Sequence, residues 1–184
     1  MTIKRFLKKE DLKKVMNWDN YYDDNRWNHF EEIISCIKKL DETEEINNIL
    51  EMGPYRTPFV VGSDIIDIKK HGYPFEINKF IEHDCSKTPF PIEDNTYDLV
   101  ISSQVLEHLG LLGEQKEIFN EIERISRMAI ISLPFNWYMP NFRSHHCIDR
   151  GVFDTWANHR EYVFEEINGT KRNNKRIIRI YKFK

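Results

Sequence analysis

The sequence has few cysteines, no long apolar run and no excess of positive charge, and each absence excludes a class of protein. Its three cysteines are widely spaced, which argues against a disulfide framework or a CxxC metal site. A membrane helix needs about 18 consecutive apolar residues, and no such stretch occurs in the sequence. The first residues also lack the apolar run of a signal peptide. Basic residues number 27 against 30 acidic ones, so the net charge of −3 creates no general attraction for nucleic acid or anionic membrane. We therefore expect a soluble, cytoplasmic protein.

Apolar residues recur at helical spacing near the start of the chain. Between residues 30 and 40 they fall at positions i, i+3, i+4 and i+7, as on one buried helix face: Phe30, Ile33, Ile34, Ile37 and Leu40. The sequence from about residue 9 to residue 40 therefore predicts helices. We expect residues 1–45 to form an N-terminal helical cap on a domain that spans residues 46–184.

Short apolar runs typical of β-strands replace the helical pattern after residue 45. Five of them lie within residues 46–53, 59–68, 75–84, 97–103 and 128–134. Residues 113–127 have a helical pattern, so the last two runs form a β-α-β unit with parallel strands. Two further runs, 160–167 and 176–184, flank an Asn-Gly turn signal and predict an antiparallel hairpin. These patterns indicate an α/β fold with a mixed sheet edge.

Acidic residues follow several of the predicted strands. Glu51 closes the first strand and is followed by Gly53, Asp67 closes the second, and Asp84 follows the third, just before Cys85. In open α/β sheets, ligands bind beyond the carboxyl ends of the strands, where carboxylates can accept hydrogen bonds from ribose hydroxyls. The strand ends therefore predict the position of a ligand site.

Residues 88–109, TPFPIEDNTYDLVISSQVLEHL, carry a resemblance to a known family. They are similar to the "lPf.d.sfD.V" and "s.vlEHl" motifs of class I S-adenosylmethionine-dependent methyltransferases, specifically the type 11 group. Residues 121–134 resemble the helix and fifth strand of that group, so the resemblance spans residues 46–184. It implies a Rossmann-like three-layer sandwich whose mostly parallel sheet is closed by a C-terminal antiparallel hairpin. It also implies S-adenosylmethionine as cofactor and methyl transfer to an oxygen or nitrogen of a small molecule or saccharide.

The resemblance assigns cofactor contacts by position along the sequence. Glu51 and Gly53 would shape the methionine end of the pocket, Asp67 would bind the ribose, and Asp84 would hold the adenine. The full set that the resemblance implies in cofactor binding is Glu51, Gly53, Pro54, Asp67, Asp84, Cys85 (through its amide) and Ser103.

The chain departs from the family pattern after Gly53. The family's glycine loop continues into a helix, whereas this chain reaches its next strand within about ten residues, and a helical crossover needs about 10 to 12 residues beyond its loops. We expect the first crossover helix to be missing or reduced to a turn. Tyr55 and Arg56, or Tyr22 and Arg26 from the cap, are candidates to replace the lost contacts.

Three histidines are candidate proton acceptors for the methyl transfer: His108, His145 and His146. The last two follow the fifth strand, on the acceptor side of the sheet. Glu107 can serve the active site or cap the amides of a helix start, and both interpretations stay open. Adjacent histidines usually point apart, and no second cluster has matching spacing, so we expect no metal site. Nearby aromatic residues can wall an acceptor site but more often complete a core: Trp137, Tyr138, Phe142 and Phe153.

Two other functions remain open. Because the further glycines of the family's loop are missing after Gly53, the chain could be a catalytically silent module that binds S-adenosylmethionine or a partner. The basic residues within 171–184 suggest a nucleic-acid methyltransferase, yet isoleucines alternate there with Arg179 and Tyr181, which predicts a half-exposed strand with a solvated basic face. No NPPY-like tetrapeptide for a flipped base is present. We therefore expect a small-molecule or saccharide acceptor as partner, and neither nucleic acid nor a membrane.

Overall fold

The computed structural model describes residues 5–12, 14, 24–109, 113–141, 145 and 147–183. The strands are β1 (Ile49–Met52), β2 (Asp64–Asp67), β3 (Phe80–Glu82), β4 (Tyr97–Ser103), β5 (Ser126–Pro134), β6 (Phe164–Asn168) and β7 (Arg176–Lys182). The helices are α1 (Lys9–Leu12), α2 (Asp24–Thr43), α3 (Gln115–Ile125) and α4 (Arg150–Trp156), with 3-10 turns η1 (Leu106–His108) and η3 (Arg172–Asn174). Among the described helices, none has both the length and the apolar composition needed to cross a bilayer.

All seven strands form one sheet in the order β3-β2-β1-β4-β5-β7-β6. The first five strands are parallel, and β7 runs antiparallel between β5 and β6. The strand order reverses between β1 and β4, which is the place where α/β sheets of this type bind ligands. The predicted Rossmann-like fold, with its mostly parallel sheet and its C-terminal antiparallel pair, is confirmed.

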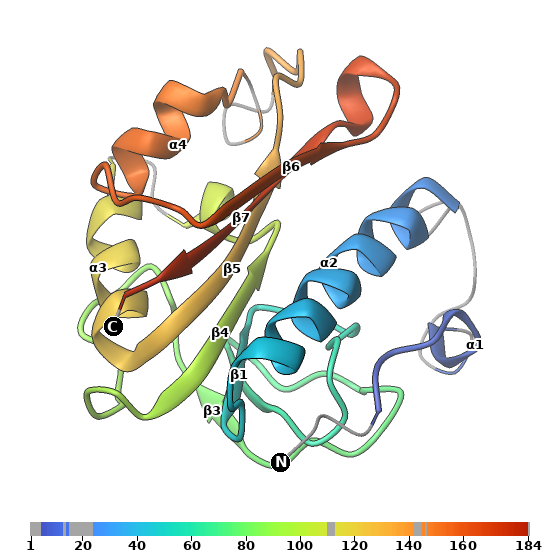
Figure 1. Cartoon of the computed structure of the whole chain (residues 1–184), viewed down its shortest axis with the longest axis vertical. Helices are drawn as coiled ribbons and strands as arrows, with labels where there is room; N and C mark the ends of the chain where they lie inside the picture. Colours follow the sequence, from blue (N-terminus) through green and yellow to red (C-terminus); the bar gives the residue numbers. More distant parts are fainter. Residues whose placement is uncertain are drawn as a thin grey trace.

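Helices cover both faces of the sheet and make three layers (Figure 1). On one face, Ile33 and Ile37 of α2 pack in a core cluster with Ile130 of β5. On the other face, Ile122 of α3 packs in a second cluster with Ile131. Burying one such side chain stabilises the fold by about 1.5–3 kcal/mol. Helix α2 therefore contributes directly to the sheet's core, while the division of the chain at residue 45 stays a prediction.

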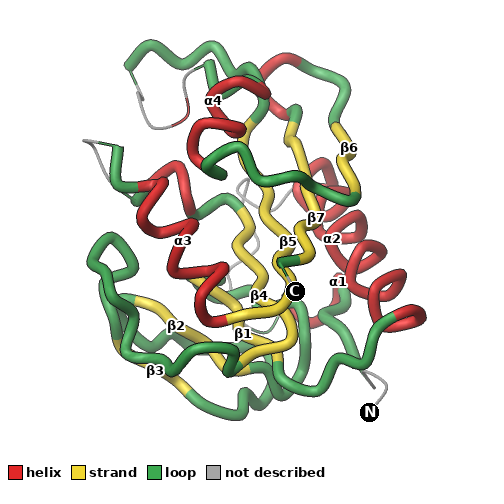
Figure 2. The backbone as a smooth tube through the Cα atoms, turned by 60° about the vertical axis from the view of Figure 1, so that its left-hand side comes forward, coloured by secondary structure: helices red, strands yellow, loops and turns green. Residues whose placement is uncertain are grey.

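The crossovers from β1 to β2, from β2 to β3 and from β3 to β4 contain no helix (Figure 2). The expectation that the first crossover helix is missing is thus confirmed. Phe59 and Val60 from the shortened loop are buried in the same cluster as α2, and the Phe59 ring meets the Phe30 ring edge-on at 5.3 Å between centroids. Loop side chains and α2 together cover the sheet where a crossover helix would otherwise pack.

Strand β7 is buried on both faces, which corrects the expectation of a half-exposed strand. Ile178 and Ile180 face the α2 side, in agreement with the predicted alternation. Arg179 and Tyr181, however, are only 1% and 0% exposed. The solvated basic face predicted for residues 171–184 therefore does not exist along β7, and this strand offers no basic stripe for a nucleic-acid backbone.

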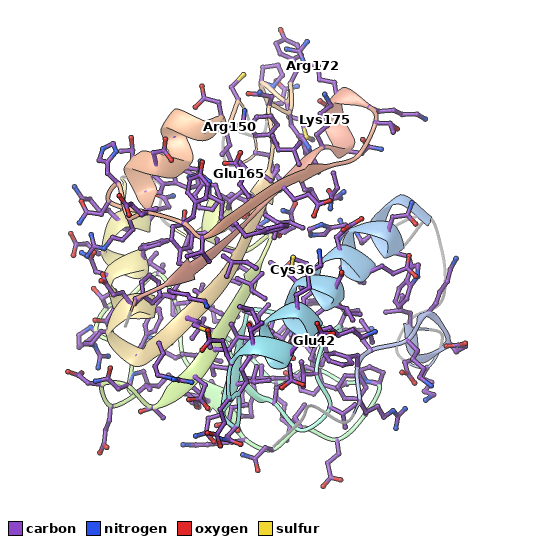
Figure 3. All side chains as sticks on the ribbon, in the orientation of Figure 1. Cys36, Glu42, Arg150, Glu165, Arg172 and Lys175 are labelled. Atoms are coloured by element: carbon purple, nitrogen blue, oxygen red, sulfur yellow. The ribbon has the colours of Figure 1, made fainter. Side chains whose placement is uncertain are left out.

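Ion pairs explain why an arginine can be buried there. The Arg179 Nε donates to Glu165 Oε2 at 2.9 Å, and its Nη1 donates to Asp154 Oδ1 at 2.6 Å. Arg150 at the start of α4 donates from Nε to the other Glu165 oxygen at 2.7 Å, and Figure 3 shows these two labelled side chains between α4 and β6. Because α4 covers this face, the arginine is paired instead of solvated.

Candidate active site

A cavity of about 670 Å³ opens at the carboxyl ends of β1, β2 and β4, beside the reversal of strand order. Its volume lies within the range of about 300–1,000 Å³ that small-molecule sites usually have. Residues from α2, from three strand ends, from the loop after β5 and from the start of β7 line it. Segments that are far apart in the sequence therefore meet at this site.

Glu51 fastens the short loop that stands in place of the first crossover helix. Its Oε2 accepts a hydrogen bond from the Phe59 amide at 2.6 Å, and its Oε1 accepts from the Val60 amide at 2.9 Å and from the Ser63 hydroxyl at 2.8 Å. Burial raises the pKa of Glu51 to about 7, although these hydrogen bonds act in the opposite direction. The carboxyl group thus forms part of the cavity wall and holds residues 53–63 against the sheet.

Gly53 supplies a backbone conformation that suits few other residues. Its φ is +57°, and its amide donates to the Ile66 carbonyl at 2.9 Å. A Cβ added here would lie 2.9 Å from Cγ1 of Val105, which also lines the cavity. The absence of a side chain therefore keeps the backbone in place and leaves this part of the cavity open.

Gly53→Ala should lower the free energy of unfolding by about 1–2 kcal/mol, because the left-handed conformation is strained for alanine and Val105 must move. Urea unfolding would measure the loss. Gly72→Ala is the matched control, since no atom lies within 4 Å of its added Cβ. Alanine there should be neutral or slightly stabilising. Equal effects of the two substitutions would contradict this role for Gly53.

Asp67 brings a carboxylate to the cavity from the end of β2. Its Oδ1 accepts from the Ile68 amide at 2.7 Å, and its Oδ2 lies 4.0 Å from Nε2 of His71. Burial lowers the pKa of His71, although Asp67 opposes the shift. The Tyr55 ring packs against the imidazole with centroids 4.6 Å apart. The Asp67 carboxylate is therefore a hydrogen-bond acceptor in the cavity, and it lies between the uncharged His71 ring and the Ile68 amide.

Asp84 and Cys85 do not line the cavity. Asp84 Oδ1 accepts from the amide of Ser86 at 3.1 Å and from its hydroxyl at 2.7 Å, and these two bonds hold the pKa of Asp84 below its usual value. Cys85 is buried in the core cluster on the α3 side, and burial raises the pKa of its thiol to about 12. Contact of these two residues with adenine stays a prediction.

His29 of α2 is the centre of a buried hydrogen-bond network that the sequence analysis missed. Its Nε2 lies 3.2 Å from the hydroxyls of Ser103 and Ser132, and its Nδ1 lies 3.3 Å from Nδ2 of Asn168. With the Asn168 amide in this orientation, its nitrogen donates to Nδ1, and the ring proton is assigned to Nε2. Burial, together with Arg176 and Arg26, holds the pKa of His29 well below its ordinary value. The cavity floor around Ser103 is therefore polar and uncharged.

On the β4 and β5 side, the His108 and His145 rings pack edge to face with centroids 4.5 Å apart, and both residues line the cavity. The Trp137 ring stacks on His145 at 5.8 Å. Burial lowers the pKa of both histidines, and for His145 the nearby His108 and Arg26 add to the shift. These imidazoles are consequently neutral near pH 7, as a proton acceptor must be.

Glu107 lies beside this pair, with its side chain fully buried. Within the described part of the chain, neither carboxylate oxygen has a hydrogen-bond partner beyond the backbone amide of Glu107 itself, and η1 has no side-chain cap hydrogen bond, so the interpretation of Glu107 as a cap finds little support. Burial raises its pKa to about 8. Its Oε1 lies 4.0 Å from Nε2 of His108. A buried acid therefore lies behind the two cavity histidines without lining the cavity itself.

The structure brings most of the predicted site residues to one cavity. Those that line it are Glu51, Gly53, Pro54, Asp67, Ser103, His108 and His145, joined by the candidates Arg26 and Tyr55 and by the aromatic Trp137. Arg56, Asp84 and Cys85 are not among the lining residues, and Phe153 is a core residue. Tyr22, Phe142 and His146 lie outside the described residues. His29 and Arg176 are lining residues that sequence reasoning missed.

Comparisons with known proteins agree with this geometry. A family described as a methyltransferase domain matches residues 62–128. No curated protein sequence matches the chain. Among solved structures, the chain is similar to the N-methyltransferase NodS of Bradyrhizobium japonicum WM9 in complex with S-adenosyl-l-homocysteine, with a TM-score of 0.62 and 10% identity over 94% of this chain and 96% of that chain.

Two further solved structures have the same fold. The PH0226 protein of Pyrococcus horikoshii OT3 has a TM-score of 0.60 and 15% identity, covering 95% of this chain and 99% of that chain. The N-terminal domain of EvdMO1, solved with SAH bound, has a TM-score of 0.56 and 11% identity, covering 94% of this chain and 93% of that chain. The resemblance based on residues 88–109 is confirmed: this chain has a class I methyltransferase fold, and its central part matches a methyltransferase domain.

Proposed function

We propose that the protein transfers the methyl group of S-adenosylmethionine to an oxygen or nitrogen of a small molecule or saccharide. The observation that carries the proposal is a single cavity that joins the ends of β1 and β2 to two neutral histidines after β4 and β5. The methyltransferase-domain match supports enzymatic activity. Two structures of the same fold contain the demethylated cofactor, which supports S-adenosylmethionine as the methyl donor.

The β1 and β2 side of the cavity is the proposed cofactor half. Asp67 accepts hydrogen bonds from the ribose hydroxyls, and Gly53 lets the backbone approach the methionine portion closely. Glu51 maintains this side by holding the loop that follows β1. Ser103, held by His29, forms the floor. Since His29 is uncharged, it does not repel the cationic sulfonium of the cofactor.

The histidine side is the proposed acceptor half. The acceptor's lone pair attacks the methyl carbon, the bond between carbon and sulfur breaks, and its electron pair stays on sulfur to give neutral S-adenosylhomocysteine. The acceptor proton passes to His108 or His145, which are neutral and line the same cavity, and His146 remains a third predicted candidate. Because the sulfonium methyl is already activated, alignment of the acceptor supplies much of the rate acceleration.

Calorimetric titration of the purified protein with S-adenosylmethionine and with S-adenosylhomocysteine tests this proposal. We expect both ligands to bind with micromolar-range affinity. Incubation with S-adenosylmethionine and pools of amines, alcohols and saccharides should then yield S-adenosylhomocysteine and a product heavier by one methylene unit in mass spectrometry. Absence of binding to both ligands would overturn the proposal.

Binding without turnover in any pool would favour the silent module that the shortened loop suggests. A nucleic-acid substrate would reveal itself by salt-sensitive binding to RNA or DNA, since phosphate contacts release counterions. The burial of Arg179 and its pairing with two acids speak against that substrate. Cys36 and Cys85 are buried thiols, which supports the cytoplasm as the proposed compartment.

A further inference from the structure

We propose that Glu107, His108 and His145 bind a divalent transition-metal ion, although the sequence spacing argued against any metal site. One ligand atom from each of the three residues lies within 4.8 Å of the other two. Glu107 and His108 belong to η1, whereas His145 comes from the loop after β5. Tertiary structure, and not a sequence motif, therefore assembles the set. Two imidazoles and one carboxylate are a common ligand set for zinc and for non-haem iron.

The buried carboxyl group of Glu107 is the strongest observation in favour of this site. Within the described residues, neither oxygen has a hydrogen-bond partner beyond a contact with the backbone amide of Glu107 itself, and the side chain is fully excluded from solvent. An unsatisfied buried acid destabilises a fold unless a cation or a donor compensates for it. A metal ion between Glu107 and the two histidines would provide that compensation.

Small side-chain movements suffice to complete the coordination. Metal bonds of about 2.0–2.2 Å to nitrogen and oxygen place tetrahedral ligand atoms about 3.4 Å apart. The Glu107 Oε1 and His108 Nε2 atoms are 4.0 Å apart and must approach each other by about half an ångström, whereas a pair at the 4.8 Å limit of the set must approach by about 1.4 Å. The His108 side chain is half-exposed and can rotate, and the Trp137 ring lies nearly parallel to the His145 ring with centroids 5.8 Å apart.

Two arginines oppose a cation at this position. Arg26 and Arg176 both act on Glu107 electrostatically and lower its pKa against the effect of burial. Arg176 donates from Nη1 to the Asn174 carbonyl at 3.0 Å, and its guanidinium lies 5.4 Å from the Trp137 ring. Within the described residues, the ionisable group found nearest to the Glu107 carboxyl is the His108 imidazole at 4.0 Å, which pairs with it as an ion only when protonated. Long-range compensation by the arginines is the competing explanation, and it predicts no metal binding.

A metal at this site deepens the proposed function, and its catalytic role rests on that function. Three protein ligands leave at least one coordination position open, and both histidines line the cavity. A Lewis acid there would lower the pKa of an acceptor hydroxyl that binds to it. This would favour alcohols and saccharide hydroxyls over amines as acceptors. The two ring nitrogens would act as metal ligands, and the proton of the metal-bound hydroxyl would pass to solvent water instead of to them.

Cobalt(II) titration of the untagged, full-length protein tests the site, after dialysis against a chelator. We expect binding of one equivalent, reported by visible absorption bands of a low-symmetry cobalt centre. Glu107→Gln and His108→Ala should each weaken binding by more than about 100-fold, because even partners outside the first coordination shell contribute about 10- to 100-fold. His159→Asn, at an exposed histidine, is the matched control and should leave binding unchanged. Thermal unfolding checks that each variant folds.

Each outcome of the titration has a distinct meaning. Lack of cobalt and zinc binding by the wild-type protein would overturn the proposal, as would binding that survives both Glu107→Gln and His108→Ala. His108 is half-exposed, so its alanine variant tests the site even if Glu107→Gln does not fold. Metal binding without S-adenosylmethionine binding would leave the metal site standing and remove the methyltransferase function. Binding of S-adenosylmethionine without metal binding would overturn the metal site and leave the methyltransferase proposal in place.

Discussion

Replacing Glu51 with alanine should lower the free energy of unfolding by about 2–6 kcal/mol. The substitution removes the acceptor of the Phe59 and Val60 amides, and each buried donor left without an acceptor costs about 1–3 kcal/mol, whereas the Ser63 hydroxyl can still donate to the Val60 carbonyl at 2.9 Å. Domains of this size unfold with about 5–15 kcal/mol, so the loss would be a large fraction of the total. Urea unfolding followed by circular dichroism would measure it.

The Glu51 carboxyl should also make the protein less stable as the pH rises. Its native pKa of about 7 lies above the value of 4.5 that describes the unfolded chain. Below pH 4.5 the Glu51 carboxyl is protonated in both the native and the unfolded protein. Between pH 4.5 and about 7 it is protonated only in the native protein, so a rise in pH favours the unfolded state. The full loss amounts to about 3 kcal/mol and is complete about one pH unit above the native pKa, near pH 8.

Glu51→Gln removes this titration, so the stability of the wild type relative to the variant should fall between pH 4.5 and about 8. All other titrating groups are shared and cancel in the comparison. Glu42→Gln is the matched control, because Glu42 is an exposed residue of α2 (Figure 3). The same pH dependence in both variants would show that Glu51 titrates as an ordinary carboxyl group.

Asp67→Asn should weaken the binding of S-adenosylmethionine by about tenfold to a hundredfold, since a hydrogen bond to a charged group contributes about 1.5–3 kcal/mol. Asparagine keeps an oxygen that can accept from the Ile68 amide, so the fold should persist. Calorimetric titration of both proteins under the same conditions would measure the difference.

Glu82→Gln serves as the control for charge. Glu82 ends β3 directly opposite Asp67 in the sheet, is exposed and does not line the cavity. The Glu82→Gln substitution removes the same unit of charge from the same sheet edge, and the affinity for S-adenosylmethionine should stay unchanged. A wild-type affinity in Asp67→Asn would mean that the ribose binds elsewhere, whereas equal losses in both variants would indicate a general electrostatic effect.

The order and type of the elements could be predicted because periodicity is a local property of the sequence. The stripe at residues 30–40 is buried as part of α2, and each predicted strand run overlaps an observed strand. The exposure of β7 could not be predicted in the same way. Its alternation is correct, but burial of Arg179 depends on α4 and on acids that the strand itself does not contain.

The β1 and β2 side of the site was predictable because Glu51, Gly53 and Asp67 stand at strand ends, which local patterns locate. His29 was missed, although a signal was present. It lies four residues before Ile33 and eight before Ile37, so it belongs to the same buried face of α2. A polar residue on such a stripe needs buried partners, and these partners come from distant strands that no local pattern identifies.

The dual use of α2 limits where the acceptor preference of this protein can change. The face that carries His29 into the cavity also carries Ile33 and Ile37 into the core, so a substitution there alters substrate contacts and folding stability together. Trp137 and Met139 in the loop after β5 also line the cavity but belong to neither core cluster. Directed evolution toward new acceptors should therefore accumulate changes in this loop and leave the helix intact.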